Sequence, residues 1–129
     1  MPVRSIVPSE VKALGVYTPG FEVTGGRLLF ISGQVPVDAE GNTVGEGDAA
    51  AQARQTIENL RSVLRAAGGD LRNVIKVTVF TTDMASREAI NRVRLELFGD
   101  HRPCSTNVQV VRLVNPDWLL EIEAVAVLD

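Results

Sequence analysis

The chain has 129 residues, of which 45% are hydrophobic and 22% charged, and its formal net charge is −3. These values are typical of a globular protein and exclude a disordered or fibrous chain. Because single domains usually contain about 100–200 residues, residues 1–129 are expected to form one domain. The mild negative charge argues against binding to nucleic acid or to an anionic membrane surface.

A single cysteine and the absence of long apolar runs indicate the cellular compartment in which the protein is expected. Cys104 is the one cysteine, which excludes an internal disulfide and favours a reducing environment. The first ten residues, MPVRSIVPSE, lack the apolar core of a signal peptide. No apolar run approaches the roughly 18–20 residues of a membrane span. We therefore expect a soluble cytoplasmic protein.

The N-terminal part is predicted to contain short extended segments separated by turns. Pro19 and Gly20 interrupt any strand, so residues 14–18 are predicted as a short extended piece followed by a turn. Residues 21–23 and 27–32 are predicted to pair as a hairpin, because the intervening glycines can adopt positive φ. Turn-forming residues then occupy 36–46.

The first helix is predicted over residues 48–67. Asp48 can cap its start, and the Gly68-Gly69 pair ends it. Apolar residues recur at spacings of three and four, which predicts one apolar stripe. The stripe contains Ala53, Ile57, Leu60, Leu64 and Ala67.

A second helix is predicted between two strands. Residues 73–81 are rich in β-branched side chains and predict a strand. Asp83 or Ser86 can cap the helix that follows, which runs through Phe98 and stops at Gly99. Its apolar stripe contains Ile90, Val93 and Leu97.

Two last strands complete the predicted fold. Residues 105–113 and 118–128 are predicted as strands joined by a turn at 115–117. The resulting order, β-β-α-β-α-β-β, predicts an α+β fold with two helices on one face of a sheet.

The other face of that sheet is also largely apolar. The last strand should direct Leu120, Ile122, Ala124, Ala126 and Leu128 one way, and Glu121, Glu123, Val125 and Val127 the other. Likewise, Ile75, Val77 and Val79 should oppose Val74, Lys76, Thr78 and Phe80. An exposed apolar patch of this size usually marks an interface. We predict that the sheets pack together across subunits.

Polar residues on the last two strands form the main candidate site. Ser105, Asn107 and Gln109 share one face of their strand, and Glu121 and Glu123 share one face of theirs. If the two strands pair antiparallel, these groups meet. A carboxylate on an apolar face is costly unless it is paired. It therefore either pairs with an arginine of a neighbouring subunit or lines a site as an acid/base group of raised pKa.

Other chemically interesting residues favour simpler interpretations. His101 is expected to be a solvated loop residue, and Cys104 a small half-buried residue without a depressed pKa. Arg87 and Arg94 share a helical face that is expected to be solvated or at an interface. The segment 45–50 opens a helix and can hold an anion, although capping by Asp48 explains it more simply. No ligand set for a metal and no nucleotide-binding glycine pattern are present.

Several segments, taken together and in order, resemble the Rid family, also called the RidA/YjgF family of reactive-intermediate deaminases. The resemblance covers nearly the whole chain. The matching segments are GVYTPG (15–20), LLFISGQVPVD (28–38), AAQARQTIENLRSVLRAAG (50–68), VIKVTVFTTDM (74–84), AIN (89–91), RPCSTNVQVVRL (102–113) and EIEAVAV (121–127).

The resemblance implies a chorismate-mutase-like (YjgF-like) fold and a homotrimer. In such trimers the sheets form a central barrel with the helices outside, and small-metabolite clefts lie between subunits. Deaminases of the family hydrolyse reactive imines and enamines, such as 2-iminobutanoate, to carbonyl compounds and ammonia. They need no cofactor and no metal.

Four positions match the family's cleft residues. The resemblance implies that Tyr17, Gly33 and Asn91 bind substrate, Gly33 through its backbone. It implies that Glu121 is catalytic and positions or activates the attacking water. Imine hydrolysis needs such a group, because water must be polarised toward carbon and nitrogen must leave with a proton.

Two substrate-binding positions depart from the family pattern. Ser105 stands where the deaminases have the arginine that clamps the substrate carboxylate, and Asn107 stands where they have a cysteine. A serine cannot form a bidentate, charge-assisted clamp. This pattern resembles Rid subgroups outside RidA. Three functions follow: an imine or enamine hydrolase with a substrate other than 2-iminobutanoate, a non-catalytic ligand-binding trimer, or an endoribonuclease and translation inhibitor, which the low basic charge disfavours.

Overall fold

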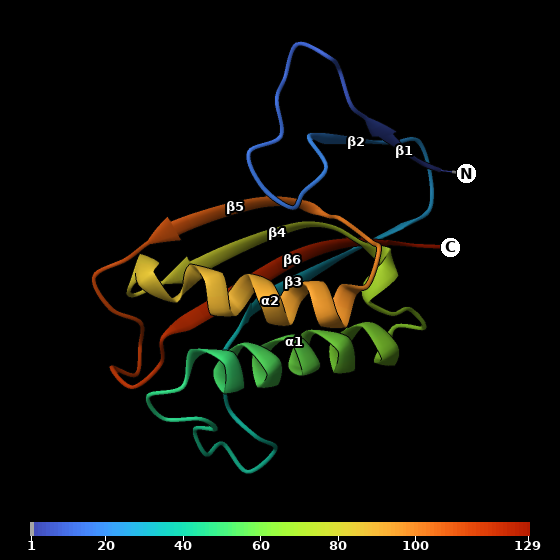
Figure 1. Cartoon of the computed structure of the whole chain (residues 1–129). Helices are drawn as coiled ribbons and strands as arrows, with labels where there is room; N and C mark the ends of the chain where they lie inside the picture. Colours follow the sequence, from blue (N-terminus) through green and yellow to red (C-terminus); the bar gives the residue numbers. More distant parts are fainter. Residues whose placement is uncertain (1) are drawn as a thin grey trace.

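The computed structural model describes residues 2–129 and has two helices packed on one face of a four-stranded sheet (Figure 1). The strands are β3 (Arg27–Gln34), β6 (Leu120–Leu128), β4 (Val74–Thr81) and β5 (Cys104–Gln109), in that spatial order. β6 is antiparallel to both of its neighbours, whereas β5 is parallel to β4. The predicted α+β fold with two helices on one face is confirmed.

The first helix, α1 (Ala49–Ala66), begins and ends as its sequence predicts. Asp48 caps it by accepting a hydrogen bond from the backbone N–H of Ala51 at 3.1 Å. After the helix, Gly68 adopts a φ of +90°, a conformation that other residues rarely tolerate. Four of the five predicted stripe residues, Ala53, Ile57, Leu60 and Leu64, are fully shielded from solvent, whereas Ala67 follows the helix as its C-cap and is half-buried.

The second helix, α2 (Arg87–Phe98), follows a short 3₁₀ turn, η2 (Met84–Ser86). Asp83 caps this turn, while Ser86 precedes α2 without a side-chain hydrogen bond. Gly99 ends α2 with a φ of +63°. A further 3₁₀ turn, η1 (Leu71–Asn73), leads into β4.

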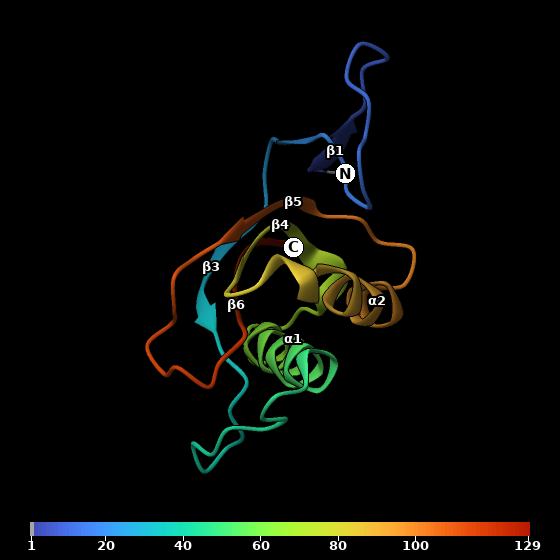
Figure 2. The same ribbon diagram turned by 60° about the vertical axis from the view of Figure 1, so that its left-hand side comes forward.

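The core lies between the helices and the sheet. It is built from the inward residues of β6 and β4 and from the apolar stripes of α1 and α2. Viewed from a second direction, both helices lie on the same side of the curved sheet (Figure 2). The opposite side, which we call the outer face, carries Leu28, Phe30, Lys76, Thr78, Glu123 and Val125, and Phe30 remains 73% exposed there.

A bulge in β4 changes the predicted alternation of its side chains. The register with β6 shifts between Val74 and Lys76, so Val74 faces the core together with Val77 and Val79. The prediction that Ile75 shares their face is wrong, because the extra residue of the bulge turns Ile75 out of the core.

The N-terminal segment is arranged differently from the predicted hairpin. β2 (Gly20–Val23) pairs with β1 (Val3–Ile6), not with β3, and residues 14–18 form no strand. Gly26, at a φ of +87°, directs the chain away from this ladder into the main sheet. Residues 2–24, which we call the arm, project beyond β5 in both ribbon views (Figures 1 and 2).

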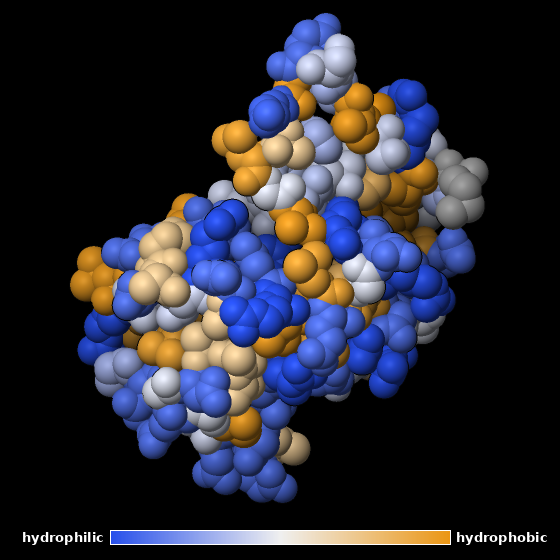
Figure 3. Space-filling model, in the orientation of Figure 1, coloured by the Kyte–Doolittle hydropathy of each residue, from blue (hydrophilic) through white to orange (hydrophobic). Residues whose placement is uncertain are grey.

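Apolar side chains are exposed on the arm (Figure 3). They are Val7, Val11, Leu14, Val16 and Val23. In the described residues 2–129, neither helix is both long and apolar enough to cross a membrane.

Candidate functional site

Glu121 and Gly33 form a close contact between β6 and β3. A Cβ atom added to Gly33 would lie 1.9 Å from Glu121 Oε2, so a side chain at position 33 would displace the carboxylate. The register pairs Glu121 with Phe80 of β4, and the glutamate is half-buried rather than in bulk solvent. The sheet therefore holds this carboxylate in place through backbone packing, with no hydrogen-bond partner for it within residues 2–129.

Tyr17 and Asn91 lie where the arm meets α2. The Tyr17 hydroxyl accepts a hydrogen bond from the backbone N–H of Leu14 at 3.0 Å. The loop around Gly15 packs against Arg87 at the start of α2. The backbone N–H of Thr18 donates to the carbonyl of Pro103 at 3.3 Å. These contacts join the base of the arm to α2 and to the segment that enters β5.

Ser105 and Asn107 lie on the helix-facing side of β5. Their register partners in β4 are Val77 and Val79, which are buried beneath the helices. The Ser105 hydroxyl oxygen is buried and has no hydrogen-bond partner in the described chain. Asn107 is half-buried. The register thus directs both side chains to the side of the sheet that the helices cover.

The predicted meeting of polar groups from the last two strands is therefore wrong within one chain. β4 lies between β5 and β6, and the two sets of side chains face opposite sides of the sheet. Glu121 and Glu123 pair with Phe80 and Thr78, which face away from the helices. Gln109 is engaged elsewhere, because its Oε1 accepts a hydrogen bond from Met84 N at 2.8 Å.

The structure hence divides the predicted site residues into two groups. The first group, Gly33 and Glu121, lies on the outer face of the sheet, between β3 and β4. The second group, Tyr17, Asn91, Ser105 and Asn107, belongs to the arm, α2 and β5. A single copy of the chain does not bring the two groups together.

A pocket that is open to solvent lies beside the second group. Its enclosed part admits only a small group of atoms, such as one end of a metabolite. Its walls come from the arm, from one face of α2 and from the loop between α2 and β5. The lining residues include Val16, Asn91, Arg94, Phe98, His101 and Pro103.

Arg94 is the residue of this pocket that the sequence interpretation missed. It was expected to be solvated or at an interface, but it is only 8% exposed. Burial, together with the positive charge of Arg87, lowers the pKa of Arg94 to about 10. The available signal was its position, four residues after Ile90 and three before Leu97, within the apolar stripe of α2.

The surroundings of His101 and Cys104 indicate structural roles for both residues. His101 Nε2 lies 2.5 Å from the carbonyl oxygen of Val74, and its ring stacks on Phe21 and Phe98. The expectation of a solvated histidine is therefore wrong. Cys104 is half-buried as expected, and burial raises the pKa of its thiol. A thiol with a raised pKa is poorly suited to act as a nucleophile.

Metal ligands do not cluster in the part of the chain that the structure describes. Within residues 2–129, no three His, Cys, Asp or Glu side chains are placed so that they can hold a metal ion. The chemistry available at the two groups is that of a carboxylate, a phenol, amides, a hydroxyl and a guanidinium.

Comparison with known proteins identifies the family. Residues 7–128 match the family model described as Endoribonuclease L-PSP. The 3-aminoacrylate deaminase RutC of Acinetobacter baylyi is 39% identical over 127 residues, which cover 98% of each chain.

Solved structures agree with this match. The crystal structure of YyfB from Yersinia pestis, described as a member of the conserved Rid protein family, has a TM-score of 0.90 and 32% identity, covering 99% of this chain and 100% of that one. E. coli TdcF, solved with bound serine, has a TM-score of 0.74 and 36% identity, covering 98% and 100%. The predicted YjgF-like fold is thus confirmed, and the chain belongs to the Endoribonuclease L-PSP family, which includes the Rid proteins.

Proposed function

We propose that this protein hydrolyses reactive imines or enamines of small metabolites to carbonyl compounds and ammonia. The observation that carries the proposal is the Glu121 carboxylate, which packs against Gly33 without a hydrogen-bond partner in residues 2–129. A half-buried carboxylate of this kind is available to act on water. The 39% identity to a relative named as a 3-aminoacrylate deaminase supports the same class of reaction.

The active unit in this proposal is a homotrimer whose outer faces meet in a central barrel. Leu28 and Phe30, which are 57% and 73% exposed, are the apolar residues that such packing would cover. Because the two groups of site residues lie on opposite sides of the sheet, each cleft would combine Gly33 and Glu121 of one copy with the Tyr17 and Asn91 group of another. Light scattering should give a mass near three times 13.9 kDa.

The reaction can be written with the groups at hand. Water attacks the carbon of the protonated C=N bond while Glu121 accepts one of its protons, which gives a neutral tetrahedral carbinolamine. Glu121 returns this proton to the nitrogen, the C–N bond breaks, and ammonia leaves as the carbinol hydroxyl gives up its proton to the carboxylate and becomes the carbonyl. An enamine reaches the same path after protonation at carbon. The Tyr17 hydroxyl and the Asn91 amide are suited to orient the substrate.

The experiment is to measure ammonia and carbonyl release from freshly generated 2-iminobutanoate and 3-aminoacrylate. General acid–base catalysis typically contributes about 10²–10⁴-fold, so Glu121→Gln should lose at least roughly 100-fold in rate. Glu123→Gln is the matched control, since Glu123 lies on the same face of β6 but is exposed. Wild-type protein no faster than buffer with both substrates, or Glu121→Gln as fast as wild type, would contradict the proposal.

Two further variants test the geometry of the site and the identity of the substrate separately. Gly33→Ala should reduce activity while the protein stays folded, because the new methyl group displaces the Glu121 carboxylate. Ser105→Arg restores the arginine of the family pattern. If only this variant acts on 2-iminobutanoate, the natural substrate differs from that compound.

Ser105 and Asn107 favour a second candidate, a trimer that binds a small ligand without converting it. Bound serine in the TdcF structure supports a ligand of amino-acid size. Binding without turnover in the assay above would select this candidate. RNA retention that weakens steeply with salt would instead indicate the endoribonuclease class, which the net charge of −3 disfavours.

A further inference from the structure

A buried arginine without a counter-charge lies beside Asn91. Arg94 is 8% exposed, and within residues 2–129 its guanidinium makes one hydrogen bond, from Nη1 to Asn91 Oδ1 at 3.4 Å. No carboxylate of this part of the chain pairs with it, whereas five other arginines form ion pairs. A guanidinium carries five N–H donors, so most of its capacity is unused. Burying a charge without a partner is costly, and a partner from outside the chain would remove that cost.

The surroundings of Arg94 favour an anion as that partner. The polar groups lining the pocket are Asn91, Arg94, His101 and Arg102, and no acidic residue is among them. The charge of Arg87 also reaches Arg94. Since the pKa of Arg94 is about 10, the guanidinium stays protonated at neutral pH. The pocket is therefore positively charged and has apolar walls, which suits a small molecule with an anionic end.

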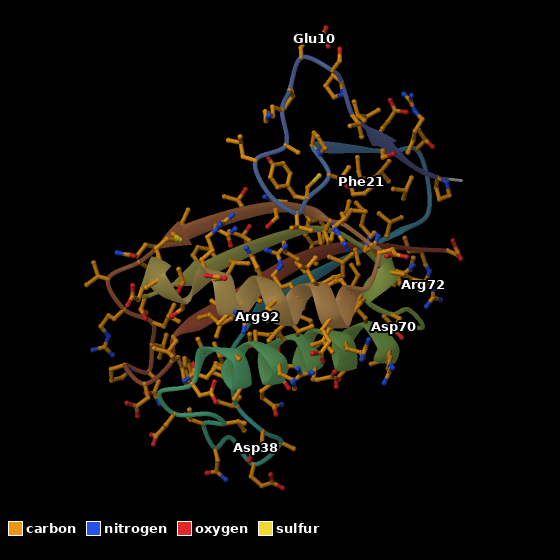
Figure 4. The ribbon with its side chains drawn as sticks, viewed as in Figure 1. Glu10, Phe21, Asp38, Asp70, Arg72 and Arg92 are labelled. Carbon is orange, nitrogen blue, oxygen red and sulfur yellow. The ribbon has the colours of Figure 1, made fainter. Side chains whose placement is uncertain are left out.

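Arg92, two residues earlier on the same helix, shows what an ordinary surface arginine looks like here. Its side chain is 76% exposed and lies 3.9 Å from Glu88, and Figure 4 labels it on α2. The two arginines share a helix and a charge but differ in burial, in pairing and in access to the pocket. Arg92 is thus a matched control for Arg94.

We propose that Arg94 binds the carboxylate of the substrate in this pocket, and that Asn91 orients the guanidinium toward it. The planar fork of an arginine matches a carboxylate with two parallel hydrogen bonds. α2 would thereby supply the guanidinium that β5 lacks at Ser105, whose buried hydroxyl has no partner in the described chain. This inference rests on the proposed function and narrows its substrate class to small imino or enamino acids.

The test is equilibrium binding of 2-oxobutanoate, the stable carbonyl product, measured by calorimetry with butanone as the uncharged match. Losing a charge-assisted bidentate contact should weaken 2-oxobutanoate binding roughly 10- to 100-fold in Arg94→Met. Arg92→Met should change it by less than about twofold. Butanone should bind weakly to all three proteins. Arg94→Met that binds 2-oxobutanoate as tightly as wild type, or phosphate that competes equally well with it, would overturn the assignment.

A second variant keeps the proposal testable if Arg94→Met does not fold. Asn91→Asp places a carboxylate beside Arg94 and supplies the missing counter-charge within the chain. Its melting temperature should rise, and its binding of 2-oxobutanoate should fall by roughly tenfold or more. Unchanged binding together with unchanged stability would contradict the role of Arg94.

Failure of this inference can be told apart from failure of the proposed function. Binding of 2-oxobutanoate that depends on Arg94, without ammonia release, supports the carboxylate site and contradicts the hydrolase. Ammonia release from uncharged imines alone, unaffected by Arg94→Met, supports the hydrolase and overturns the carboxylate site.

Discussion

The two faces of the sheet differ in how much of their apolar surface the chain covers by itself. Beneath the helices, Leu60 and Ile122 are at most 1% exposed. On the outer face, Leu28 and Phe30 remain 57% and 73% exposed, although both are in the same sheet. The helices bury the apolar residues of one face in the core, whereas the other face presents the kind of apolar surface that proteins bury against a partner.

The difference shows that apolar alternation alone does not tell a core from an interface. β6 supplies apolar residues to both faces, and the helices decide which face becomes the core. The carboxylates of Glu121 and Glu123 occur only on the outer face, where a completed core would not tolerate them unpaired. Polar groups within an otherwise apolar strand therefore mark the face where a site can form.

The strongest way to test this comparison is to remove the same leucine atoms from each face. Leu60→Ala should lower the free energy of unfolding by about 2–5 kcal/mol, because it leaves a cavity in a packed core. Leu28→Ala should cost much less in dilute protein, since its side chain is already exposed. Urea denaturation followed by circular dichroism measures both. Equal losses would show that the outer face is as well packed as the core.

A charged side chain on the outer face should prevent assembly of the trimer without unfolding the chain. We expect Phe30→Asp to shift the mass from that of a trimer to that of one chain, because burying an unpaired carboxylate in an interface is costly. The far-ultraviolet circular dichroism spectrum should stay unchanged. A variant that remains trimeric would place the subunit contacts elsewhere.

A smaller effect on stability is expected on the side of the sheet that the helices cover, where the Asp70 carboxylate links the end of α1 to η1. Its carboxylate accepts a hydrogen bond from Leu71 N at 2.7 Å and pairs with Arg61 and Arg65. The bond from Leu71, followed by the Arg61 interactions, holds the pKa of Asp70 below its ordinary value. Its stabilising effect is therefore present above the unfolded-state pKa and is lost as pH falls through the folded-state pKa.

Asp70→Asn should accordingly lower stability at pH 7 by less than about 1 kcal/mol, as is usual for partly exposed ion pairs. The difference from wild type should vanish in acid, once the wild-type carboxylate is protonated. Denaturation at several pH values measures this. A difference that is independent of pH would assign the effect to the cap geometry instead of the charge.

Local features of the fold could be predicted from the sequence. The cap of α1, the glycine stops and the apolar stripes of both helices depend on neighbours within a few residues, and the structure confirms them, whereas α2 has no side-chain cap. Strand partners depend on distant segments, so the pairing of β2 with β1 was missed. The parallel pairing of β5 with β4 could have been found, because a strand–helix–strand unit favours a parallel crossover.

The candidate site could be predicted residue by residue but not as an arrangement. The family motifs identified Glu121 and Asn91, whereas their separation by the sheet follows from β4 lying between β5 and β6. The sequence interpretation misses Arg94, because it places this charged residue in solvent or at an interface. Its place in the apolar stripe of α2 carried more information than its charge.

The central position of β6 has a consequence for synthesis on the ribosome. β6 is the last strand in chain order, yet it alone joins β3 to β4. Until it has been made, β3 has no partner in the main sheet, and α1 has half a sheet to pack on. The main sheet is complete only when β6 has inserted between β3 and β4.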